Sequence, residues 1–335
     1  MAAPSPIPFF DAVSAYQRTE AIRAALSLDL FTAIAETKGS LPETAARCAA
    51  SERGLRILCD FLVIQGFLTK AGGRYALAEQ TAPFLVKGSP AYLGGSLEFL
   101  LSPDLVQGFA DLAGCVRRGG TTLSAHGTME TQHPVWVKFA RVMGPVIARS
   151  APFIAELMDP KGDRPLDVLD IAAGHGLFGI AFAQRNPRAQ ITAQDWGPVL
   201  EVAQEHARQA SVGDRYRLLP GDAFEVDFGI GRDVVLLTNF LHHFDVPTCE
   251  RLLQRVARCL KPGGTAVTLE FVPNEDRVTP PPAATFALTM LATTAAGDAY
   301  TFGEYESMLR NAGFSRNTLH AVPESPQSVI VSTVP

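Results

Sequence analysis

Three carboxylates lie at or near the ends of predicted strands in the second half of the chain: Asp170, Asp195 and Asp222. In a parallel sheet the carboxyl ends of the strands meet at one edge, and ligands bind there. We therefore expect the three side chains to lie close together. Negative charge at such a place suits a ligand that carries positive charge and hydrogen-bond donors.

A glycine loop follows the strand that contains Asp170. Gly174, Gly176 and Gly179 form a G-x-G-x-x-G sequence, and Asp195 lies about 20 residues further on, which is the spacing of a dinucleotide fingerprint. Asp170, however, would repel a pyrophosphate at the mouth of this loop. An NAD-linked oxidoreductase is thus the weaker interpretation, and a ligand that bears an ammonium or a sulfonium is the stronger one.

The residues after the second and third strands suit a nucleoside. Asp195 can accept hydrogen bonds from two ribose hydroxyls, and Trp196 offers a flat face to an adenine, although a tryptophan is often simply part of a core. Asp222 can accept from an exocyclic amine, with Ala223 and Phe224 beside the ring. S-adenosylmethionine combines an ammonium, a sulfonium, a ribose diol and an adenine, and it has no phosphate.

Two adjacent histidines, His242 and His243, follow the fourth predicted strand. An imidazole at this edge of the sheet suits a general base at neutral pH. Glu270 lies in the apolar fifth strand, where it can either orient that imidazole or form an ordinary salt bridge. The other histidines are scattered, so we predict no metal site.

We predict that an α/β fold positions these residues. It is a Rossmann-like doubly wound sheet of seven strands with helices on both faces and an antiparallel last strand. The turn at 323–326 is too short for a crossover helix, so the last two strands pair antiparallel. The predicted strands are 166–171, 189–194, 216–221, 233–238, 264–272, 316–322 and 327–334.

The N-terminal part predicts a mostly helical winged helix. Residues 9–35 have helical apolar spacing, Ser51 is a plausible N-cap for the helix that follows it, and Gly72-Gly73 marks a hairpin turn. Winged helices serve either in DNA binding or in protein contacts. Because basic and acidic residues balance over residues 1–100, the basic surface that a DNA-binding domain needs is missing, and a DNA-binding regulator is disfavoured.

We predict three domains. Residues 1–95 form the winged helix, residues 96–160 are connecting helices that contribute to a substrate pocket, and residues 161–335 form the ligand-binding catalytic domain. The pocket for a small-molecule acceptor is expected to include an apolar set with Phe286 and Met290 on one helical face, although such a pair often faces a core. The predicted acceptor set includes Asn239, His243, Phe286 and Met290.

Composition narrows the function classes further. Hydrophobic residues make up 47% of the 335 residues and charged residues 19%, with a formal net charge of −5. This argues for a folded core and against general nucleic-acid or membrane-surface binding. There is no apolar run of about 18 residues and no secretory signal pattern. Five cysteines without a C-x-x-C fit a reducing cytoplasm.

In combination these motifs resemble the class I S-adenosylmethionine-dependent methyltransferases. More narrowly, the chain resembles the plant-type and bacterial small-molecule O-methyltransferases with an N-terminal winged-helix dimerisation domain. The resemblance extends from about residue 10 to residue 334. It rests on residues 170–176, 195–196, 221–224, 241–242, 261–264 and 311–314.

The resemblance implies a role for each matching position. It implies S-adenosylmethionine as methyl donor and S-adenosylhomocysteine as product. Asp170, Gly174 and Gly176 would hold the methionine part, Asp195 the ribose, and residues 196 and 222–224 the adenine. Phe139 and Met143 match the family's Phe-x-x-x-Met helix, which implies that Phe139 belongs to the acceptor pocket and that Met143 binds the cofactor near the acceptor. His242 would be the catalytic base and Glu270 the carboxylate that orients it, and the N-terminal domain would form a homodimer.

Several positions depart from the family pattern. His243-Phe244 replaces the usual Asp-Trp, Ala172 and Ala173 replace glycines, and Ala299 stands where plant members have a second glutamate. Asp298 could replace that glutamate. The resemblance favours methyl transfer to a hydroxyl of an apolar, aromatic secondary metabolite. Because of these departures, two alternatives stay open: an N- or C-methyltransferase, and a non-methylating relative on the same fold.

Overall fold

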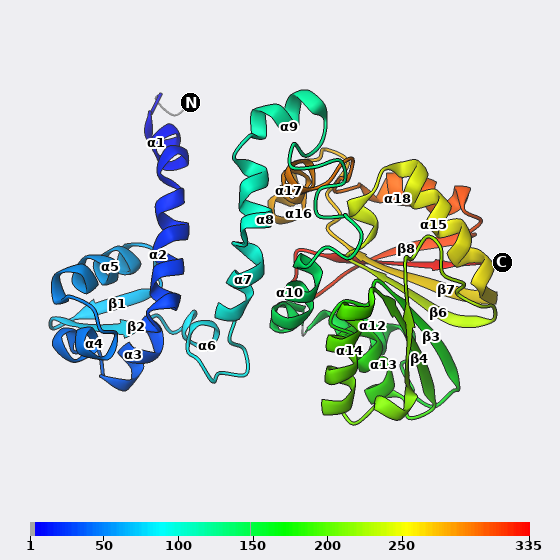
Figure 1. Ribbon diagram of the computed structural model, residues 1–335, viewed down its shortest axis with the longest axis horizontal. Coiled ribbons are helices and arrows are strands. Elements are labelled where there is room, and N and C mark those ends of the chain that lie inside the picture. Colours follow the sequence, from blue (N-terminus) through cyan, green and yellow to red (C-terminus); the bar gives the residue numbers. More distant parts are fainter. Residues whose placement is uncertain (1–3, 148) are drawn as a thin grey trace. The chain divides into compact units, whose positions relative to one another are not determined.

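The computed structural model describes residues 4–147 and 149–335, and it divides into two compact units between Leu97 and Glu98 (Figure 1). The predicted connecting helices therefore fall mainly in the second unit, together with the sheet. Position 148, in the predicted connecting helices 96–160, lies outside the described residues.

The first unit consists of helices followed by a short hairpin. The stretch 9–35 is not one helix but three, and Asp29, with φ of 53°, begins the third in a left-handed conformation. Ser51 caps the fifth helix by accepting a hydrogen bond from Gly54 N at 3.1 Å, as predicted. The elements are α1 Ile7–Ser14, α2 Tyr16–Ser27, α3 Leu30–Glu36, α4 Leu41–Arg47, α5 Glu52–Ile64, β1 Leu68–Ala71, β2 Arg74–Leu77 and α6 Ala82–Leu85.

The apolar residues of these helices fall into two groups. Leu30 and Phe31 are buried in the core of the unit. Phe9, Phe10 and Val13 on α1, in contrast, are 66%, 62% and 59% exposed. The apolar stripe of the N-terminal sequence is thus split, because its C-terminal part forms the local core and only its N-terminal part remains at the surface. The hairpin β1–β2 turns at Gly72 and Gly73, both with positive φ, as predicted.

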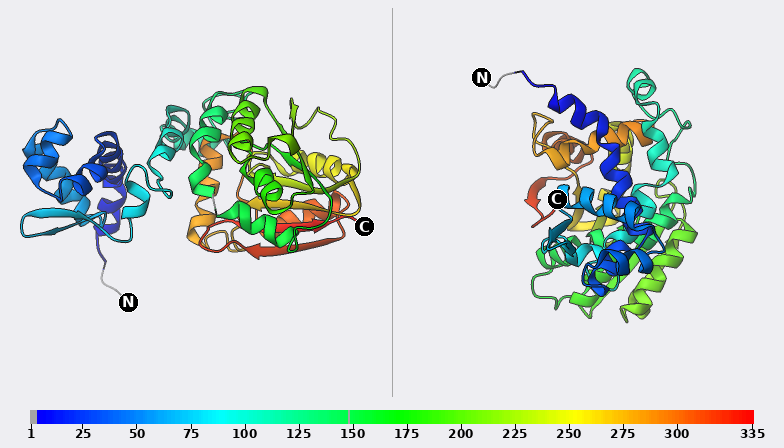
Figure 2. Two further views of the ribbon diagram at one scale, coloured as in Figure 1. Left: turned by 90° about the horizontal axis from the view of Figure 1, so that it is seen from below. Right: turned by 90° about the vertical axis from the view of Figure 1, so that its left-hand side faces the viewer.

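The second unit contains the predicted seven-stranded sheet, with the strand order β5-β4-β3-β6-β7-β9-β8. All neighbours are parallel except β9, which pairs antiparallel with both β7 and β8. Figure 2 shows the red strands of the C-terminal part of the chain along one edge, where β8 is the last strand of the order. The α/β fold prediction is therefore confirmed. The bounds are β3 Leu166–Ile171, β4 Ala189–Asp195, β5 Tyr216–Pro220, β6 Arg232–Thr238, β7 Leu260–Glu270, β8 Arg316–Ala321 and β9 Ser328–Thr333.

Helices cover both faces of this sheet (Figure 1). One core contains residues of α12 (Ser150–Met158), α13 (Leu177–Arg185) and α14 (Gly197–Gln209), and the core on the other face contains residues of α15 (Val246–Cys259) and α18 (Phe302–Asn311). β3 contributes Val168 to the first core and Leu169 to the second, because successive side chains of a strand point to opposite faces. β3 is therefore buried on both faces, whereas the edge strand β8 remains largely exposed.

Proline breaks the helical stretch 135–158 into three helices. Pro145 and Pro152 each lie in the first turn of a new helix, where the missing N–H costs least. The helices are α10 Val135–Val142, α11 Gly144–Ile147 and α12. Elsewhere in the unit the helices are α7 Leu97–Leu100, α8 Pro103–Val106, α9 Leu112–Arg118, α16 Pro281–Ala284 and α17 Phe286–Thr293. Within the described residues, no helix combines the length and the apolar character that a membrane crossing needs.

Candidate active site

The glycine loop after β3 is tied to the end of β4 by three consecutive backbone amides. Ala172 N donates to Gln194 Oε1 at 3.3 Å, Ala173 N to Gln194 O at 3.0 Å, and Gly174 N to Asp195 Oδ2 at 2.8 Å. Ala172 and Gly174 have φ of 52° and 57°. The amides at the start of α13, where a dinucleotide-binding loop cradles a phosphate, are engaged within the loop itself: Gly176 N donates to Ala173 O at 2.8 Å and Leu177 N to His175 Nδ1 at 3.1 Å.

Asp170 lies beneath this loop and is completely buried. Its Oδ2 accepts a hydrogen bond from Gly179 N at 3.0 Å, and its Oδ1 has no partner among the described residues. Burial first, and then the charge of Asp195, raise the pKa of Asp170 to about 7. Asp170 does not line the cavity described below. Of the three carboxylates predicted to lie close together, Asp195 and Asp222 line this cavity, and Asp170 lies beneath the loop, close enough for the charge of Asp195 to affect its pKa.

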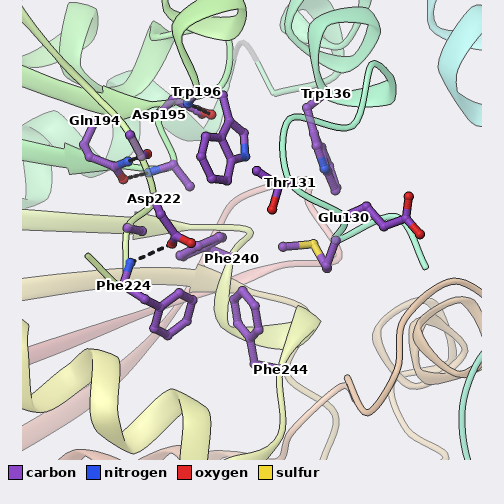
Figure 3. A pocket seen from close by; sticks show the side chains of 14 residues that line it. Glu130, Thr131, Trp136, Gln194, Asp195, Trp196, Asp222, Phe224, Phe240 and Phe244 are labelled. Carbon is purple, nitrogen blue, oxygen red and sulfur yellow. Dashed lines mark hydrogen bonds between the residues drawn. The ribbon is translucent and has the colours of Figure 1, made fainter. Parts of the chain in front are cut away.

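A cavity of about 560 Å³, including its opening to solvent, lies at the carboxyl ends of β3, β4 and β5 (Figure 3). Its lining joins carboxylates, an amide and aromatic rings. The predicted cofactor residues Asp195, Trp196, Asp222, Ala223 and Phe224 all line it. Sequence reasoning missed the remaining lining residues as site residues: Met129, Glu130, Thr131, Trp136, Ala172, Gln194, Gly221, Phe240 and Phe244.

Backbone amides hold both carboxylates of the cavity in place. Asp195 Oδ1 accepts from Trp196 N at 2.7 Å, and Asp222 Oδ1 accepts from Phe224 N at 2.9 Å. Burial raises the pKa of Asp195 to about 6, although its bonds to Gly174 N and Trp196 N act against this shift. Asp222 Oδ2 forms no hydrogen bond with another described residue and remains available as an acceptor.

His242 and Glu270 form a buried pair at the ends of β6 and β7. His242 Nδ1 donates to Glu270 Oε2. Glu270 Oε1 accepts from Phe240 N at 3.1 Å and Leu241 N at 2.9 Å, so the carboxylate fixes the backbone that carries the histidine as well as its ring. Because Nδ1 is the donor, Nε2 of a neutral His242 is the acceptor. The pair has the geometry of a base and the group that orients it.

His243 has a different environment from its neighbour. Its ring lies 4.2 Å from that of His242 and edge-on to Trp136 at 5.1 Å between centroids. Its Nδ1 lies 3.2 Å from Phe240 O. Burial, followed by the charge of His242, lowers the pKa of His243 well below its ordinary value, so this imidazole is neutral. Through Trp136, which lines the cavity, His243 connects the histidine pair to the proposed nucleoside region.

Two of the predicted acceptor residues contact the histidine pair and the glycine loop, namely Phe286 and Phe139. Phe286 lies edge-on to His242, with ring centroids 4.8 Å apart, and stacks on Phe271 at 4.0 Å. Met290, one helical turn further along α17, is 4% exposed. Asn239, with φ of 56°, shares a side-chain hydrogen bond with Gln327 of the last hairpin.

Phe139 and Met143 lie in one apolar cluster on α10 and just after it. The Phe139 ring stacks on His175 of the glycine loop, with centroids 5.7 Å apart. A Cβ atom on Gly174 would come within 3.3 Å of the Phe139 ring. The Phe-x-x-x-Met segment is therefore packed directly against the glycine loop, although neither residue lines the cavity.

Asp298 does not take the place of a second glutamate at His242. Its backbone N–H donates to His242 O at 3.0 Å, but its carboxylate accepts from Ala299 N and pairs with Arg277. The segment supports His242 through the backbone alone. In the described part of the chain, no group of three or more His, Cys, Asp and Glu side chains is arranged to hold a metal ion.

The sheet order, the glycine loop and the carboxylates after β4 and β5 define a nucleoside-binding α/β domain of the methyltransferase type. Family models agree with this class. The O-methyltransferase domain matches residues 124–315, which is more than half of the chain, and the O-methyltransferase dimerisation domain matches residues 10–87. The chain therefore belongs to the O-methyltransferase family, the S-adenosylmethionine-dependent family that its motifs resemble.

Individual relatives cover almost the whole chain. The solved structure of a candidate O-methyltransferase from Nostoc punctiforme is 52% identical, covers 99% of this chain and 100% of its own, and has a TM-score of 0.95. The 3-hydroxy-5-methyl-1-naphthoate 3-O-methyltransferase of Streptomyces sahachiroi is 28% identical over 91% of this chain and 88% of its own. The L-tyrosine C(3)-methyltransferase of Streptomyces lavendulae is 26% identical over 93% and 88%.

Proposed function

We propose that this enzyme transfers the methyl group of S-adenosylmethionine to a hydroxyl of an apolar, aromatic small molecule. The His242–Glu270 pair carries the proposal. An imidazole held through Nδ1 by a buried carboxylate is built to accept a proton at Nε2. The apolar rings of Phe286 and Phe271 beside it suit a flat acceptor.

The cavity lining fits the methyl donor. Asp195 would accept from the ribose hydroxyls, and the free Oδ2 of Asp222 would accept from the adenine amine. Trp196 and Phe224 would cover the ring faces. Gly174, Gly176 and Met143 would be placed toward the methionine part, and Asp170 would act beneath the loop. The bound donor supplies an electrophilic methyl group on a sulfonium.

His242 would take the hydroxyl proton at Nε2 while the acceptor oxygen becomes the nucleophile. Glu270 would stabilise the imidazolium that results, without taking the proton itself. Phe139, Asn239, His243, Phe286 and Met290 would shape the acceptor pocket. The rest of the rate would come from holding the oxygen and the methyl group together, because proximity removes much of the entropic barrier.

Calorimetric titration with S-adenosylhomocysteine tests the cofactor assignment, with NAD⁺ as the control. We expect micromolar binding of the first and none of the second. The engagement of Gly176 N by Ala173 O and of Leu177 N by His175 Nδ1 is the reason to expect no pyrophosphate binding. Absence of S-adenosylhomocysteine binding would contradict the proposal. A hydroxyl rather than a carbon as acceptor is tested separately, by identifying the methylated product of a panel of phenols.

We further propose that the enzyme is a homodimer assembled through its dimerisation domain. The exposed apolar side chains Phe9, Phe10 and Val13 of α1 support this assembly. Light scattering should give twice the monomer mass of 35.9 kDa. Replacing Phe9 and Phe10 by glutamate should give monomers. Replacing Ile230, which is 88% exposed in the second unit, should leave the mass unchanged.

A further inference from the structure

Gln194 is the one buried amide side chain among the residues that line the cavity. It precedes Asp195 at the end of β4 and is 1% exposed. In Figure 3 its side chain lies beside Asp195, to one side of the other lining residues. A buried amide needs partners for both its oxygen and its nitrogen, because each unsatisfied group would cost about 1–3 kcal/mol.

Both partners of Gln194 are backbone groups. Its Nε2 donates to Gly221 O at 2.6 Å, and its Oε1 accepts from Ala172 N at 3.3 Å. A carbonyl can only accept and an amide N–H can only donate, so the orientation of the side chain is fixed. One side chain therefore connects the loop after β3 with the turn after β5, across the end of β4.

The two connected segments face different parts of the cavity. The loop after β3 carries Gly174, which binds the Asp195 carboxylate. The turn after β5 carries Asp222 and Phe224, and its Gly221 N donates to Asp195 O at 3.0 Å. The hydrogen bonds of residues 194 and 195 therefore set the distance between Asp195, the proposed ribose contact, and Asp222, the proposed adenine contact.

We propose that Gln194 is a positioning residue for the nucleoside: its amide holds the loop after β3 and the turn after β5 at the spacing that lets Asp195 and Asp222 bind one adenosine together. The inference rests on the proposed function, since it assumes that the cavity binds an adenosine moiety. Gln194 lies outside the motifs that the chain shares with the family. Its role is to hold the two segments of the cavity in position before the ligand binds.

Titrations with S-adenosylhomocysteine and with adenosine test the assignment. Gln194→Met removes both hydrogen bonds at nearly constant volume, and we expect the Kd of both ligands to rise about tenfold, the effect of one lost hydrogen bond. Gln194→Glu keeps an acceptor for Ala172 N but opposes Gly221 O, so a larger rise is expected. Because both ligands contain the adenosine, their Kd values should rise by the same factor.

Thr192→Val is the matched control. Thr192 lies on the same strand and accepts a hydrogen bond from Arg232 at 3.1 Å, away from both loops. It should lower the melting temperature about as much as Gln194→Met without changing either Kd. Unchanged affinities in the Gln194 variants would overturn the inference, and so would an equal loss in Thr192→Val. A wild-type protein that binds neither ligand would instead contradict the proposed function. Gln194→Met keeps the test valid if Gln194→Glu does not fold.

Discussion

The carboxyl edge of the sheet has two halves that are built differently. At the ends of β3, β4 and β5, Asp195 and Asp222 face a cavity that opens to solvent. At the ends of β6 and β7, His242 and Glu270 are 3% and 0% exposed. The first half is an open surface lined by acceptors and aromatic rings. The second is a buried pair in which Glu270 binds His242 Nδ1 with one oxygen and backbone amides with the other.

Because of this difference, affinity for the cofactor and the rate of methyl transfer should depend on different halves of the edge. A half that is open and already hydrogen-bonded to its own backbone can bind a ligand with little rearrangement. A buried histidine whose Nδ1 is engaged by a carboxylate contributes one free nitrogen, and it does so in a fixed direction. We therefore expect substitutions in the first half to change binding of the cofactor product and those in the second to change the rate alone.

The largest effect should come from His242→Ala. General-base assistance is typically worth about 10²- to 10⁴-fold, so kcat should fall within that range. The Kd of S-adenosylhomocysteine should stay within about twofold, because His242 does not line the cavity. Transfer to strongly acidic phenols should suffer least, since they lose the proton without help. Single-turnover rates and calorimetry on the same preparation measure both quantities.

Glu270→Gln gives the matched control for that comparison. It removes the charge that stabilises an imidazolium but keeps an oxygen that can accept from Phe240 N and Leu241 N. A rate as low as that of His242→Ala with unchanged binding supports the separation of the two halves. A parallel loss of cofactor-product affinity in both variants would show that the halves are not independent.

The next largest effect is the pH dependence of protein stability that Asp170, in the first half, causes. Burial raises the pKa of Asp170 to about 7, above the value near 3.9 of an unfolded chain. The folded state therefore keeps this proton longer than the unfolded state. The free energy of unfolding should fall by on the order of 3 kcal/mol as the pH rises from 4 to 8.

Asp170→Asn should flatten that part of the pH profile. Denaturant unfolding at pH 5 and pH 8 measures the difference between the variant and the parent. We expect the variant to gain relative stability at pH 8, because no buried carboxylate has to ionise. Asp195, with a pKa raised to about 6, contributes a smaller fall between pH 4 and 6 that should remain in the variant. An unchanged slope would rule out Asp170 as its source.

Asp195→Ala should weaken S-adenosylhomocysteine binding by about 100-fold, the effect of losing two hydrogen bonds to a charged group. The same substitution frees Gly174 N and Trp196 N. Asp195→Asn retains a single acceptor oxygen, and we expect an intermediate affinity. Calorimetry on the parent and the two variants measures the three Kd values and hence their order. Equal Kd values for Asp195→Ala and the parent would remove the ribose assignment from this half.

Much of the first half could be predicted from the sequence, because its residues follow strands directly. Asp195, Trp196 and Asp222 are placed by strand ends alone. Trp136 and Met129 come from a connecting segment far away in the chain, and no spacing rule brings them to the cavity. Gln194 precedes a predicted aspartate, but its role depends on Gly221 O and Ala172 N, which only the folded sheet places on either side of it.

Burial is the property that the sequence does not reveal. Asp170 matches the motif, but the side chain lies beneath the loop and not in the cavity. Leu30 and Phe31 have the same apolar character as Phe9, although they form the core of the first unit and Phe9 is exposed. Residue type and period identify an apolar face, but which part of that face is covered depends on the packing of the whole unit.

The smallest effect concerns the two alanines that stand where the family has glycines. Ala172 has φ of 52°, a conformation that costs an L-residue about 1–2 kcal/mol, whereas Ala173 is not left-handed. Ala172→Gly should therefore raise the free energy of unfolding by about 0.5–1 kcal/mol, and Ala173→Gly should lower it by a similar amount through the entropy of the unfolded chain. Denaturant midpoints measure both changes.

If the amides of residues 172–174 hold the loop through Gln194 and Asp195, neither variant should alter the Kd of S-adenosylhomocysteine by more than about threefold. A loss of binding in Ala172→Gly alone would mean that the loop depends on its own strained backbone and not on the end of β4.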